Sequence, residues 1–560
     1  MVERNSADFS RRGVLAGGVG SAWAGASLAQ PADVASIGQP AGAIQRPIDE
    51  IHVISSEQVI SHDLIMTPRG GFQIARGATL RLMGDLVAPA AQIFFGPGTV
   101  DLTHSRLLFA RPEWWGGFAG RPEIDCRASL SACIASHPAM QLGLGDYHLG
   151  GTWTIDQPNR RVWGVGRTKG GKGTRLLLTA GAGPVVLVGT EDPPNEINLY
   201  LRGIDMRWLE LGRSSAAPPP KSGDPASVAT GLAVRHVLDS VFEGLRANEH
   251  AVGFSLRGAV RTFVRDCAAF RSLAPDPGGR DIFVGFDLDG RDPPIATGAN
   301  ASLYLIDCVA STGNHPRLSI STGCRLAGAF SDTFIIRLET TALGRGIDVV
   351  GDKRGGPPRP GRARNLDLHI ELPVLDQCLE CGISIEDLDD DAMIDVVTPY
   401  VGLGPNAISA ISICNSGGAV SVLGGQLVGT PAPGAAGIVM EDVSGVAFNG
   451  TKLLDFSEPV KANRLAFCEL ILLVNRAHGS GAGAAISLNG ASHCYLRPRL
   501  MGSAKAYRTA VDIDGSSHGV VVELAGVDRR VLTDAGAVML ENRAWSTADA
   551  GRVDVRGAFD

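Results

Sequence analysis

A short apolar phrase recurs about ten times between residues 230 and 515, and it reads Gly or Ala, apolar, any residue, apolar. Neighbouring copies begin roughly 22 to 48 residues apart, and several spacings lie near 25. A repeat of this length built from short strands is typical of a solenoid, in which each turn buries its apolar edge against the next turn. The copies begin at Gly231, Gly253, Gly285, Gly323, Gly346, Gly382, Ala410, Gly437, Ala485 and Ala510.

After most copies the chain passes through a polar or Gly-containing turn into a second alternating segment, as at 260–267, 302–308 and 366–372. Alternation over such short stretches predicts strands. We therefore predict an all-β chain that forms a right-handed parallel β-helix, a solenoid with a short helix capping its N-terminal end. The alternative is an ordinary β-sandwich with many strands.

The third residue of each phrase is expected to face outward, because side chains alternate between the two faces of a strand. If successive coils stack in register, these residues form one external column with rungs ~4.8 Å apart. Asp287, Arg325 and Asp348 then occupy consecutive rungs, with the two carboxylates ~9–10 Å apart. The column reads Ala233, Ser255, Asp287, Arg325, Asp348, Ser384, Ser412, Val439, Ser487 and Asp512.

The second strands give another candidate row of outward side chains. On one coil we predict that Phe334, Ile336 and Leu338 point inward, which leaves Arg337 and Glu339 outside. On the next coil the inward residues are Leu366, Leu368 and Ile370, and the outward ones are Asp367, His369 and Glu371.

The N-terminus resembles an export signal. The twin arginines in SRRGVL (10–15) precede a weakly apolar, Gly/Ala-rich run, and Ser27-Leu28-Ala29 is a plausible cleavage site. No later segment holds about 18 consecutive apolar residues, so we expect no membrane span. We therefore expect twin-arginine export to the bacterial periplasm or beyond; the alternative is an unstructured tail with a chance arginine pair.

Charge and cysteine content limit the kinds of partner, cross-link and cofactor that we expect. The formal net charge of −7 gives no reason to expect nucleic acid as a partner. Ten cysteines in an exported chain invite a disulfide framework, but their spacing favours small buried core residues instead. Cys378-Leu-Glu-Cys381 has metal-like spacing without a second pair, and the acidic run 389–391 is a candidate calcium site, so Ca²⁺ is a possible cofactor.

The chain divides into five parts by composition and pattern. We predict a signal peptide at 1–29, a linker at 30–46, a small β region or cap at 47–112, the β-helix at 113–541 and a polar tail at 542–560. Within the β-helix, apolar residues at helical offsets between 125 and 137 predict a helix with Asp125 as its N-cap. An amphipathic helix there would cover the unpaired strand edges at the open end.

Three loops are longer than a minimal coil requires and flank the coils that carry Asp287, Arg325 and Asp348. They span 272–301, 351–365 and 386–391. Insertions on one side of a solenoid commonly build its binding face. The basic loop places Asp352, Lys353 and Arg354 beside the acidic column, where cations could bind an anionic sugar.

Several segments resemble the entry region of the pectate-lyase-like parallel β-helix superfamily, which includes phage tailspikes and bacterial exopolysaccharide depolymerases. They are PEWWGG (112–117), the predicted helix 125–137, LGLGDYHL (142–149) and RVWGVGR (161–167). With the repeats, the similarity covers most of residues 50–540. It implies the fold and a carbohydrate polymer as ligand. The resemblance assigns no catalytic residue, because the sequence contains no catalytic motif that defines one of these families. Look-alike tailspikes commonly form trimers, so a homotrimer is possible.

Two mechanisms fit the outward rows. An inverting hydrolase needs a proton-donating carboxyl group and a second carboxylate ~6.5–9.5 Å away, and Asp287 and Asp348 lie near the upper end of that range. A lyase needs a base beside a uronate carboxylate, together with cations or calcium that neutralise it. Arg325, Lys353, Arg337 and His369 could fill those roles, with Asp287, Asp348 or Asp352 holding a metal.

We favour elimination on an acidic, uronate-containing polysaccharide, because the basic loop lies beside the acidic column. Hydrolysis is the first alternative, and a non-catalytic polysaccharide-binding or envelope protein is the second. The residues predicted to contact the substrate are Asp289, Glu339, Asp352, Arg354 and Glu371.

Overall fold

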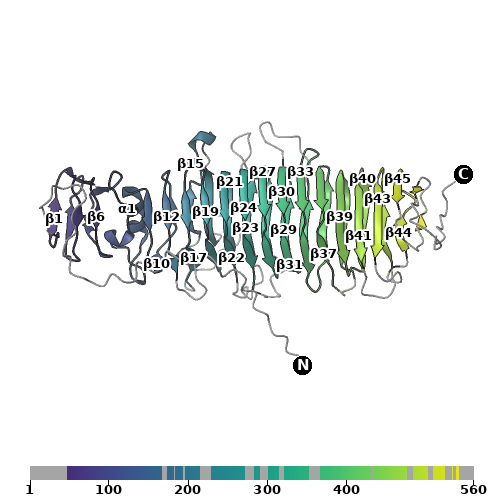
Figure 1. Cartoon of the computed structure of the whole chain (residues 1–560), viewed down its shortest axis with the longest axis horizontal. Helices are drawn as coiled ribbons and strands as arrows, with labels where there is room; N and C mark the ends of the chain where they lie inside the picture. Colours follow the sequence, from purple (N-terminus) through teal and green to yellow (C-terminus); the bar gives the residue numbers. More distant parts are fainter. Residues whose placement is uncertain are drawn as a thin grey trace, which may run out of the picture.

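The computed structural model describes residues 47–541 except for 167–172, 182, 193, 195, 215–228, 272–282, 291–299, 314–320, 352–365, 431–433, 476–482, 502–506, 508, 524–531 and 534–537. The chain winds into one elongated stack of coils whose strands run across the long axis (Figure 1). A continuous sheet of 39 strands extends from β9 (Ala139–Gln141) to β47 (Val538–Glu541), and neighbouring coils pair in parallel. The predicted parallel β-helix is therefore confirmed, and the alternative of a β-sandwich is wrong.

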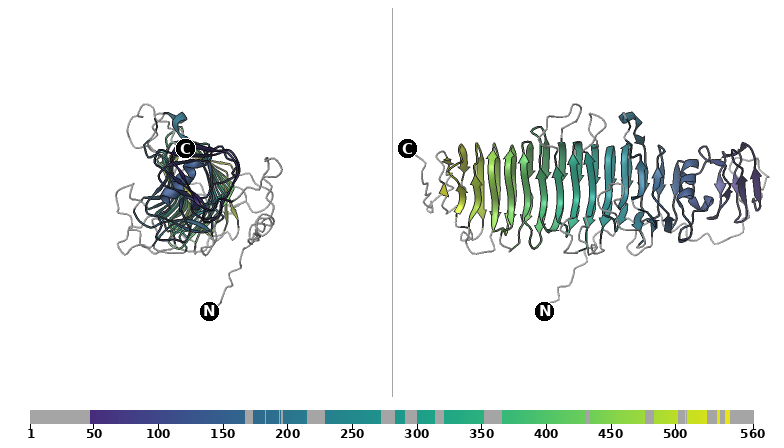
Figure 2. Two further views of the ribbon diagram at one scale, coloured as in Figure 1. Left: turned by 90° about the vertical axis from the view of Figure 1, so that its left-hand side faces the viewer. Right: turned by 180° about the vertical axis from the view of Figure 1, so that it is seen from behind.

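Each regular coil contributes one strand to each of three walls, which enclose a narrow apolar core (Figure 2). We call them the first, second and third walls. The recurrent phrase of the sequence forms the first wall. Its strands are β11 (Trp153–Ile155), β14 (Pro184–Gly189), β18 (Thr230–Leu238), β21 (Val252–Arg265), β23 (Phe283–Gly290), β26 (Ser321–Gly328), β29 (Arg345–Val350), β32 (Cys381–Glu386), β35 (Ser409–Ser416), β38 (Ala436–Ser444), β40 (Glu458–Ala466), β42 (Ala484–Asn489), β44 (Thr509–Ile513) and β46 (Leu532–Thr533).

The second wall follows the first in every coil, and some long strands bend from one wall into the next. It contains β9, the second half of β21, β47, β12 (Arg161–Trp163), β16 (Asp205–Arg207), β19 (Val241–Glu243), β24 (Asn300–Ile306), β27 (Phe330–Ile336), β30 (Leu366–Glu371), β33 (Met393–Val397), β36 (Ala419–Leu423), β39 (Val446–Leu454), β41 (Glu469–Asn475), β43 (Tyr495–Met501) and β45 (Val520–Glu523). The short strand β15 (Leu201–Arg202) pairs with the end of β18.

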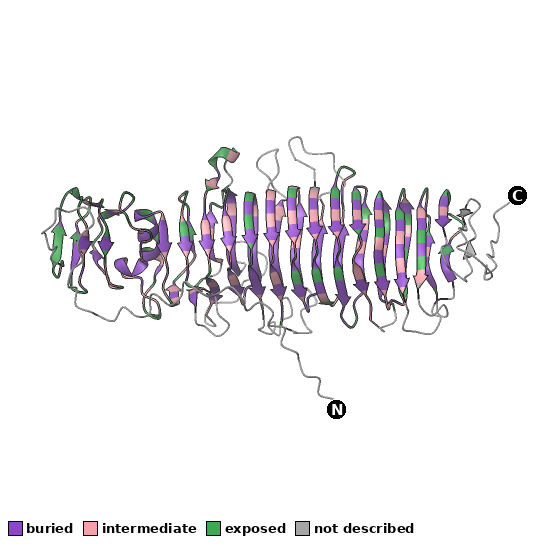
Figure 3. Ribbon diagram, viewed as in Figure 1, coloured by how far each residue is buried: buried purple, intermediate pink, exposed green. Residues whose placement is uncertain are grey.

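The third wall has the shortest strands, and it closes each coil. It contains β10 (Gly145–Leu149), β13 (Thr174–Leu178), β17 (Glu210–Arg213), β20 (Arg246–Asn248), β22 (Ala268–Phe270), β25 (Val309–Ser311), β28 (Glu339–Thr341), β31 (Val374–Cys378), β34 (Tyr400–Leu403), β37 (Gln426–Val428) and the second halves of β39, β41 and β43. Along all three walls buried side chains alternate with more exposed ones, which is visible as bands across the strands (Figure 3).

Eight short strands form three small parallel sheets before the long sheet begins. The 3-10 helix η1 (Pro112–Trp115) follows them, and a second one, η2 (Ile197–Leu199), lies in a later connection. The strands are β1 (Ile51–Ile54), β2 (Gln58–Ile60), β3 (Leu64–Ile65), β4 (Gly71–Ile74), β5 (Thr79–Leu82), β6 (Leu86–Val87), β7 (Phe94–Phe95) and β8 (Thr99–Asp101).

The helix α1 (Arg127–Ser136) covers the N-terminal end of the long sheet, as predicted, but it does not end the molecule. The strands β1 to β8 continue beyond it (Figure 1). The predicted N-cap is also wrong, because Cys126 precedes the helix and Asp125 lies one residue further out. The Asp125 carboxylate instead accepts hydrogen bonds from the backbone N–H groups of Arg127 and Gly150, so it ties the helix to the first coil.

The glycine that opens the repeated phrase has a packing role. At Gly253 an added Cβ would lie 2.5 Å from the Ala269 methyl group and 2.6 Å from the carbonyl oxygen of Gly285 on the next coil. The same close approach recurs at Gly285, Gly323 and Gly346. On these coils the first and third walls therefore approach too closely for a Cβ, whereas other coils carry Ala410, Ala485 or Ala510 at the same position.

We expect Gly285→Ala to lower the free energy of unfolding by about 1–3 kcal/mol, because overpacking a filled core costs that much. Its Cβ would lie 2.5 Å from Ala310 Cβ and 2.6 Å from the Gly323 carbonyl oxygen. Gly212→Ala is the matched control, since its Cβ would meet only the side chains of Arg175 and Leu177 at 3.3 and 3.4 Å. Urea denaturation checks this; equal midpoints for both variants would contradict the packing role.

The corner between the second and third walls is a regular left-handed turn. At successive coils a residue with positive φ donates its backbone N–H to a carbonyl oxygen of the next coil. The residues in this turn ladder are Trp208, Gly244, Asp266, Asp307, Arg337, Leu372, Thr398 and Gly424, with φ between 51° and 65°. Left-handed geometry favours Gly, Asn and Asp, so the bulky and β-branched members are strained.

Thr398 is the least suitable of these residues, since it is β-branched at φ 51° and precedes a proline. We expect Thr398→Gly to raise the free energy of unfolding by about 1 kcal/mol, because relief of left-handed strain exceeds the entropy cost of glycine. Thr154→Gly is the control. Thr154 lies in strand β11, where glycine lowers stability. Thermal denaturation of both variants checks the prediction, and a lower melting temperature for Thr398→Gly would refute it.

All ten cysteines are free thiols, and nine of them are buried. This agrees with the prediction that they serve as small core residues and not as a disulfide framework. Burial raises the pKa of most of these thiols, including Cys324 and Cys378, which keeps them protonated.

Candidate functional site

Asp287, Arg325 and Asp348 lie on adjoining coils of the first wall, as predicted. Asp287 is the register partner of Arg325, and Arg325 is the register partner of Asp348. The Nε atom of Arg325 donates to Asp287 Oδ1 at 2.9 Å. The rest of the column is also in register. One rung was missed: Lys461 lies between Val439 and Ser487, and its phrase begins with Pro459 instead of Gly or Ala.

Asp348 is bound by Arg345 and not by its register partner Arg325. Arg345, at the start of the same strand, donates to Asp348 Oδ1 at 2.7 Å and also to Glu380 at 2.8 Å. The side chains of Asp287 and Asp348 are only 12% and 11% exposed. Burial opposes the charge on Arg345, but the neighbouring carboxylates outweigh it and raise the pKa of its guanidinium. Both aspartates are therefore ion-paired carboxylates with little exposed surface.

The other predicted site residues lie on different walls. Asp289 is on the first wall, two residues after Asp287, but His369 and Glu371 are on the second wall and Glu339 is on the third. Arg337 occupies the turn ladder and pairs with Asp307 at 2.6 Å. Asp352, Lys353 and Arg354 lie outside the described residues. Of the predicted site residues that the structure describes, Asp287, Asp289, Arg325 and Asp348 lie together on the first wall, and the roles assigned to all of the site residues stay predictions.

The predicted orientation of β27 is wrong in part. Thr333 and Ile335 are fully buried, whereas Phe334 and Ile336 lie outward. Leu338 is buried, as predicted. The left-handed turn at Arg337 separates Leu338 from the strand, so the alternation does not continue across it.

Phe334 belongs to a stack of rings on the outer face of the second wall. Phe263, Tyr304, Phe334 and His369 stack with centroids 4.7 to 5.0 Å apart and interplanar angles of 3° to 17°. The two ring nitrogens of His369 face carboxylates, with Nε2 3.3 Å from Asp367 and Nδ1 3.3 Å from Asp395. The His369 ring is therefore held by Phe334 on one face and by the two carboxylates at its nitrogens.

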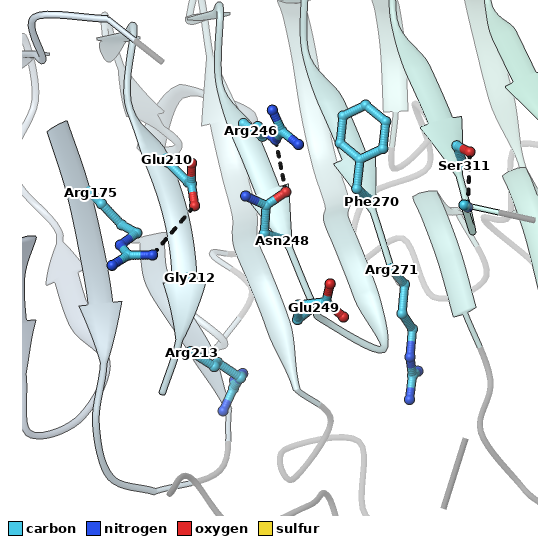
Figure 4. Close-up of a pocket in the computed structure, with 11 residues that line it drawn as sticks. Arg175, Glu210, Gly212, Arg213, Arg246, Asn248, Glu249, Phe270, Arg271 and Ser311 are labelled. Atoms are coloured by element: carbon cyan, nitrogen blue, oxygen red, sulfur yellow. Dashed lines mark hydrogen bonds and ion pairs between the residues drawn. The ribbon is translucent and has the colours of Figure 1, made fainter. Parts of the chain in front are cut away.

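The described part of the third wall carries a cleft that the sequence did not predict. It has a volume of about 350 Å³ and lies over β13, β17, β20, β22 and β25 (Figure 4). Four arginines and two glutamates line it, so its side chains carry a net positive charge. We call it the arginine cleft; it is lined by Arg175, Glu210, Gly212, Arg213, Arg246, Asn248, Glu249, Phe270, Arg271, Ser311 and Gly313.

Neighbouring side chains position the arginines of this cleft. Arg246 donates to Asn248 Oδ1 at 2.9 Å, and its guanidinium lies 4.5 Å from the centroid of the Phe270 ring. Arg175 donates to Asp146 at 2.8 Å, and its Nη1 atom lies 3.9 Å from Glu210 (Figure 4). Arg175 binds the Asp146 carboxylate through both Nε and Nη2. Arg246, held by Asn248 and Phe270, is therefore the better pre-organised for a further planar carboxylate, which accepts two parallel hydrogen bonds.

A buried histidine positions Arg213. His250 lies beneath the cleft, and its Nε2 atom is 2.9 Å from the carbonyl oxygen of Leu211. Burial, with a contribution from Arg213, lowers the pKa of His250 to about 3. The imidazole is therefore neutral, Nε2–H donates to Leu211, and Nδ1 accepts from Arg213 Nε at 3.1 Å. Burial also lowers the pKa of Arg213 to about 10.

The recurrent phrase gives no sign of this cleft, because the arginines that line it lie outside the phrase. They occupy the short strands of the third wall or the residues just after them. One part of the sequence does indicate the cleft. After the buried Cys267, the short strand Ala268–Phe270 ends in an aromatic residue, and Arg271 follows it. The register of the third wall aligns the end of this strand with the ends of its neighbours.

Three solved structures resemble this chain over most of its length. The tailspike protein of E. coli bacteriophage HK620, in complex with a pentasaccharide, has a TM-score of 0.50 at 10% identity, covering 76% of this chain and 78% of that chain. Variants of it with one aspartate replaced by alanine or asparagine, also with pentasaccharide, have TM-scores of 0.56 and 0.55 at 11% identity and the same coverage. This chain has the tailspike fold. No protein-family model and no curated protein matches the sequence.

Two further observations concern the described residues alone. None of the helices in the described ranges has the length and apolar character needed to cross a membrane. Within the same ranges, no three His, Cys, Asp or Glu side chains gather in a way that could ligate a metal, and the acidic run 389–391 is no exception.

Proposed function

We propose that this protein binds an acidic, uronate-containing polysaccharide in the arginine cleft and cleaves it by β-elimination. The observation that carries the proposal is the gathering of Arg175, Arg213, Arg246 and Arg271 around one cleft on the third wall. Guanidinium groups bind carboxylates with charge-assisted, bidentate hydrogen bonds. The pentasaccharide bound by the tailspike of bacteriophage HK620, a protein of the same fold, supports a saccharide ligand.

Elimination requires two things of the site. Cations must neutralise the uronate carboxylate, because this acidifies the proton on the adjacent C5 carbon, and a base must remove that proton. The C4–O bond then breaks as the C4–C5 double bond forms, and the departing oxygen takes a proton from solvent. The arginines of the cleft supply the cations.

We assign the base to Glu249. Its carboxylate lines the same cleft as Arg213 and Arg271, and Figure 4 shows it between Asn248 and Arg271. The backbone at Glu249 has φ 61°, and its N–H donates to the carbonyl oxygen of Phe270, which fixes this residue at the edge of the wall. With Glu249 as the base, removal of the C5 proton needs none of the four residues predicted for the lyase roles, which are Arg325, Lys353, Arg337 and His369.

Hydrolysis by Asp287 and Asp348 is the second candidate function. Their register places them two rungs apart, about 9–10 Å, near the upper end of the separation that inverting glycosidases use. The ion pairs with Arg325 and Arg345 and the low exposure of both side chains favour elimination over this alternative.

Incubation of the mature chain with polygalacturonate, alginate and hyaluronate tests the proposal. Elimination gives the ultraviolet absorbance of an unsaturated uronate, with one new reducing end for each bond broken. Reducing ends without that absorbance would instead indicate hydrolysis. Retention on the polysaccharide without either product would indicate a binding protein, and no retention by any of the three would contradict the proposed function.

Export and assembly remain proposals that follow from the sequence. The twin-arginine segment 10–15 supports export to the periplasm or beyond, where extracellular polysaccharides occur. The resemblance to tailspikes supports a homotrimer as one possible assembly.

A further inference from the structure

Trp208 is an exposed aromatic side chain in an unusual place. It lies in the turn between β16 and β17, its side chain is 40% exposed, and its backbone has φ 57°. The next three residues of the same turn ladder are Gly244, Asp266 and Asp307, which are types that left-handed geometry favours. Neither the backbone nor burial explains a tryptophan at this position.

The indole of Trp208 is part of a fixed aromatic surface. An added Cβ at Gly244 would lie 2.7 Å from its Cδ1 atom, so the ring rests on the bare backbone of the next coil. The ring centroid of Trp163 is 5.7 Å away, at an angle of 58°. The Arg207 guanidinium lies 5.5 Å from the Trp163 ring and 5.9 Å from the Trp208 ring, and Asp205 and Glu243 hold it in place.

This surface differs from the stack of rings on the second wall. There the interplanar angles of 3° to 17° mean that each ring covers the face of its neighbour. Trp163 and Trp208 are tilted by 58° and do not cover one another. The exposed and rigidly held indole of Trp208 can stack on the apolar face of a sugar ring, since the indole is amphipathic and loses little entropy on binding.

Trp208 is continuous with the arginine cleft. It lies two residues before Glu210, and Gly244 beneath it lies two residues before Arg246. The intervening Leu209 and Leu245 are fully buried, whereas Trp208 is exposed and Glu210 and Arg246 are partly exposed. Two residues along a strand span ~6.6 Å, which is roughly the length of one sugar unit.

We propose that Trp208 and Trp163 form a sugar-stacking subsite at the edge of the arginine cleft. This proposal rests on the proposed function: the cleft takes a uronate carboxylate, and the tryptophans take the apolar face of the adjoining pyranose ring. The polysaccharide then crosses the third wall along its strands, from the second-wall corner toward the first wall.

Trp208→Gly and Trp208→Phe test this subsite. Glycine suits φ 57°, so we expect Trp208→Gly to fold with an unchanged or higher melting temperature. Its affinity for whichever of polygalacturonate, alginate and hyaluronate binds the native chain most tightly should fall about 3- to 10-fold. The factor should be equal at low and high salt, because stacking involves no net charge. Trp208→Phe should retain most of the affinity and show a smaller change in tryptophan fluorescence on binding than the native chain, because Trp163 remains.

Phe467→Ala is the matched control, because Phe467 is also an exposed aromatic residue with positive φ but lies far along the axis. It should bind like the native chain. If the native chain binds a uronate polymer and Trp208→Gly binds it equally well, the subsite proposal is overturned and the proposed function stands. If the native chain binds none of the three polymers, the proposed function fails, and the subsite fails with it.

Discussion

Glu249→Gln is expected to lower the rate of β-elimination by about 10²- to 10⁴-fold, the range that a positioned general base contributes. Glutamine is nearly isosteric and lines the cleft without a basic oxygen, so substrate affinity should change little. A fall in kcat with a nearly constant KM identifies a group that acts in the transition state. The measurement is the initial rate of unsaturated-uronate absorbance over a range of polymer concentrations.

Glu469→Gln is the control for this variant, since Glu469 is an exposed carboxylate on β41, far from the arginine cleft. It should keep the native rate. If Glu249→Gln cleaves at the native rate, Glu249 is not the base. If Asp287→Asn is then inactive, the reaction belongs to the first-wall column.

The second large effect concerns acid stability. In the unfolded chain His250 binds a proton below about pH 6.5, whereas burial lowers its folded pKa to about 3. Between these values the unfolded state binds more protons, so stability is lost as the pH falls. One pKa unit corresponds to about 1.4 kcal/mol, so His250 should lower the free energy of unfolding by about 3 kcal/mol between about pH 7 and pH 4.

His250→Asn should remove most of this pH dependence. The asparagine oxygen can accept from Arg213 in place of Nδ1, and the side chain does not titrate. The difference between native chain and variant in urea-derived unfolding free energy, at the two pH values, isolates the histidine from other titrating groups. His104→Asn is the control, because His104 is exposed. Equal acid destabilisation in the native chain and His250→Asn would show that the buried imidazole is not responsible.

The sequence predicts the strands of the first wall and their register, but not the turns between the second and third walls. Gly285-Phe-Asp-Leu and its relatives specify inward and outward faces because core packing and the close approach at glycine constrain them together. The register of Asp287, Arg325 and Asp348 follows directly. The turn at Arg337 could not be predicted, because a left-handed residue inside an alternating segment does not change the hydrophobicity pattern. As a result, Phe334 lies outward and not inward as predicted.

The candidate site was harder to predict for a different reason. The arginine cleft brings together residues from five coils, and Arg175 and Arg271 stand almost a hundred residues apart in the sequence. Their strands on the third wall are short, so periodicity gives little signal. The column also gives no sign of the partner of Asp348, because Arg345 reaches it along the same strand and is not itself a member of the column.

The most direct test of the account is the affinity of the native chain and an Arg246→Gln/Arg271→Gln double variant for polygalacturonate, alginate and hyaluronate at increasing salt. An Arg261→Gln/Arg464→Gln variant, changed at exposed arginines that do not line the cleft, matches its net charge. We predict that the cleft variant binds at least about 10-fold more weakly at low salt and depends less on salt than the native chain. Equal affinity of the two double variants would contradict an acidic-polysaccharide site in the arginine cleft.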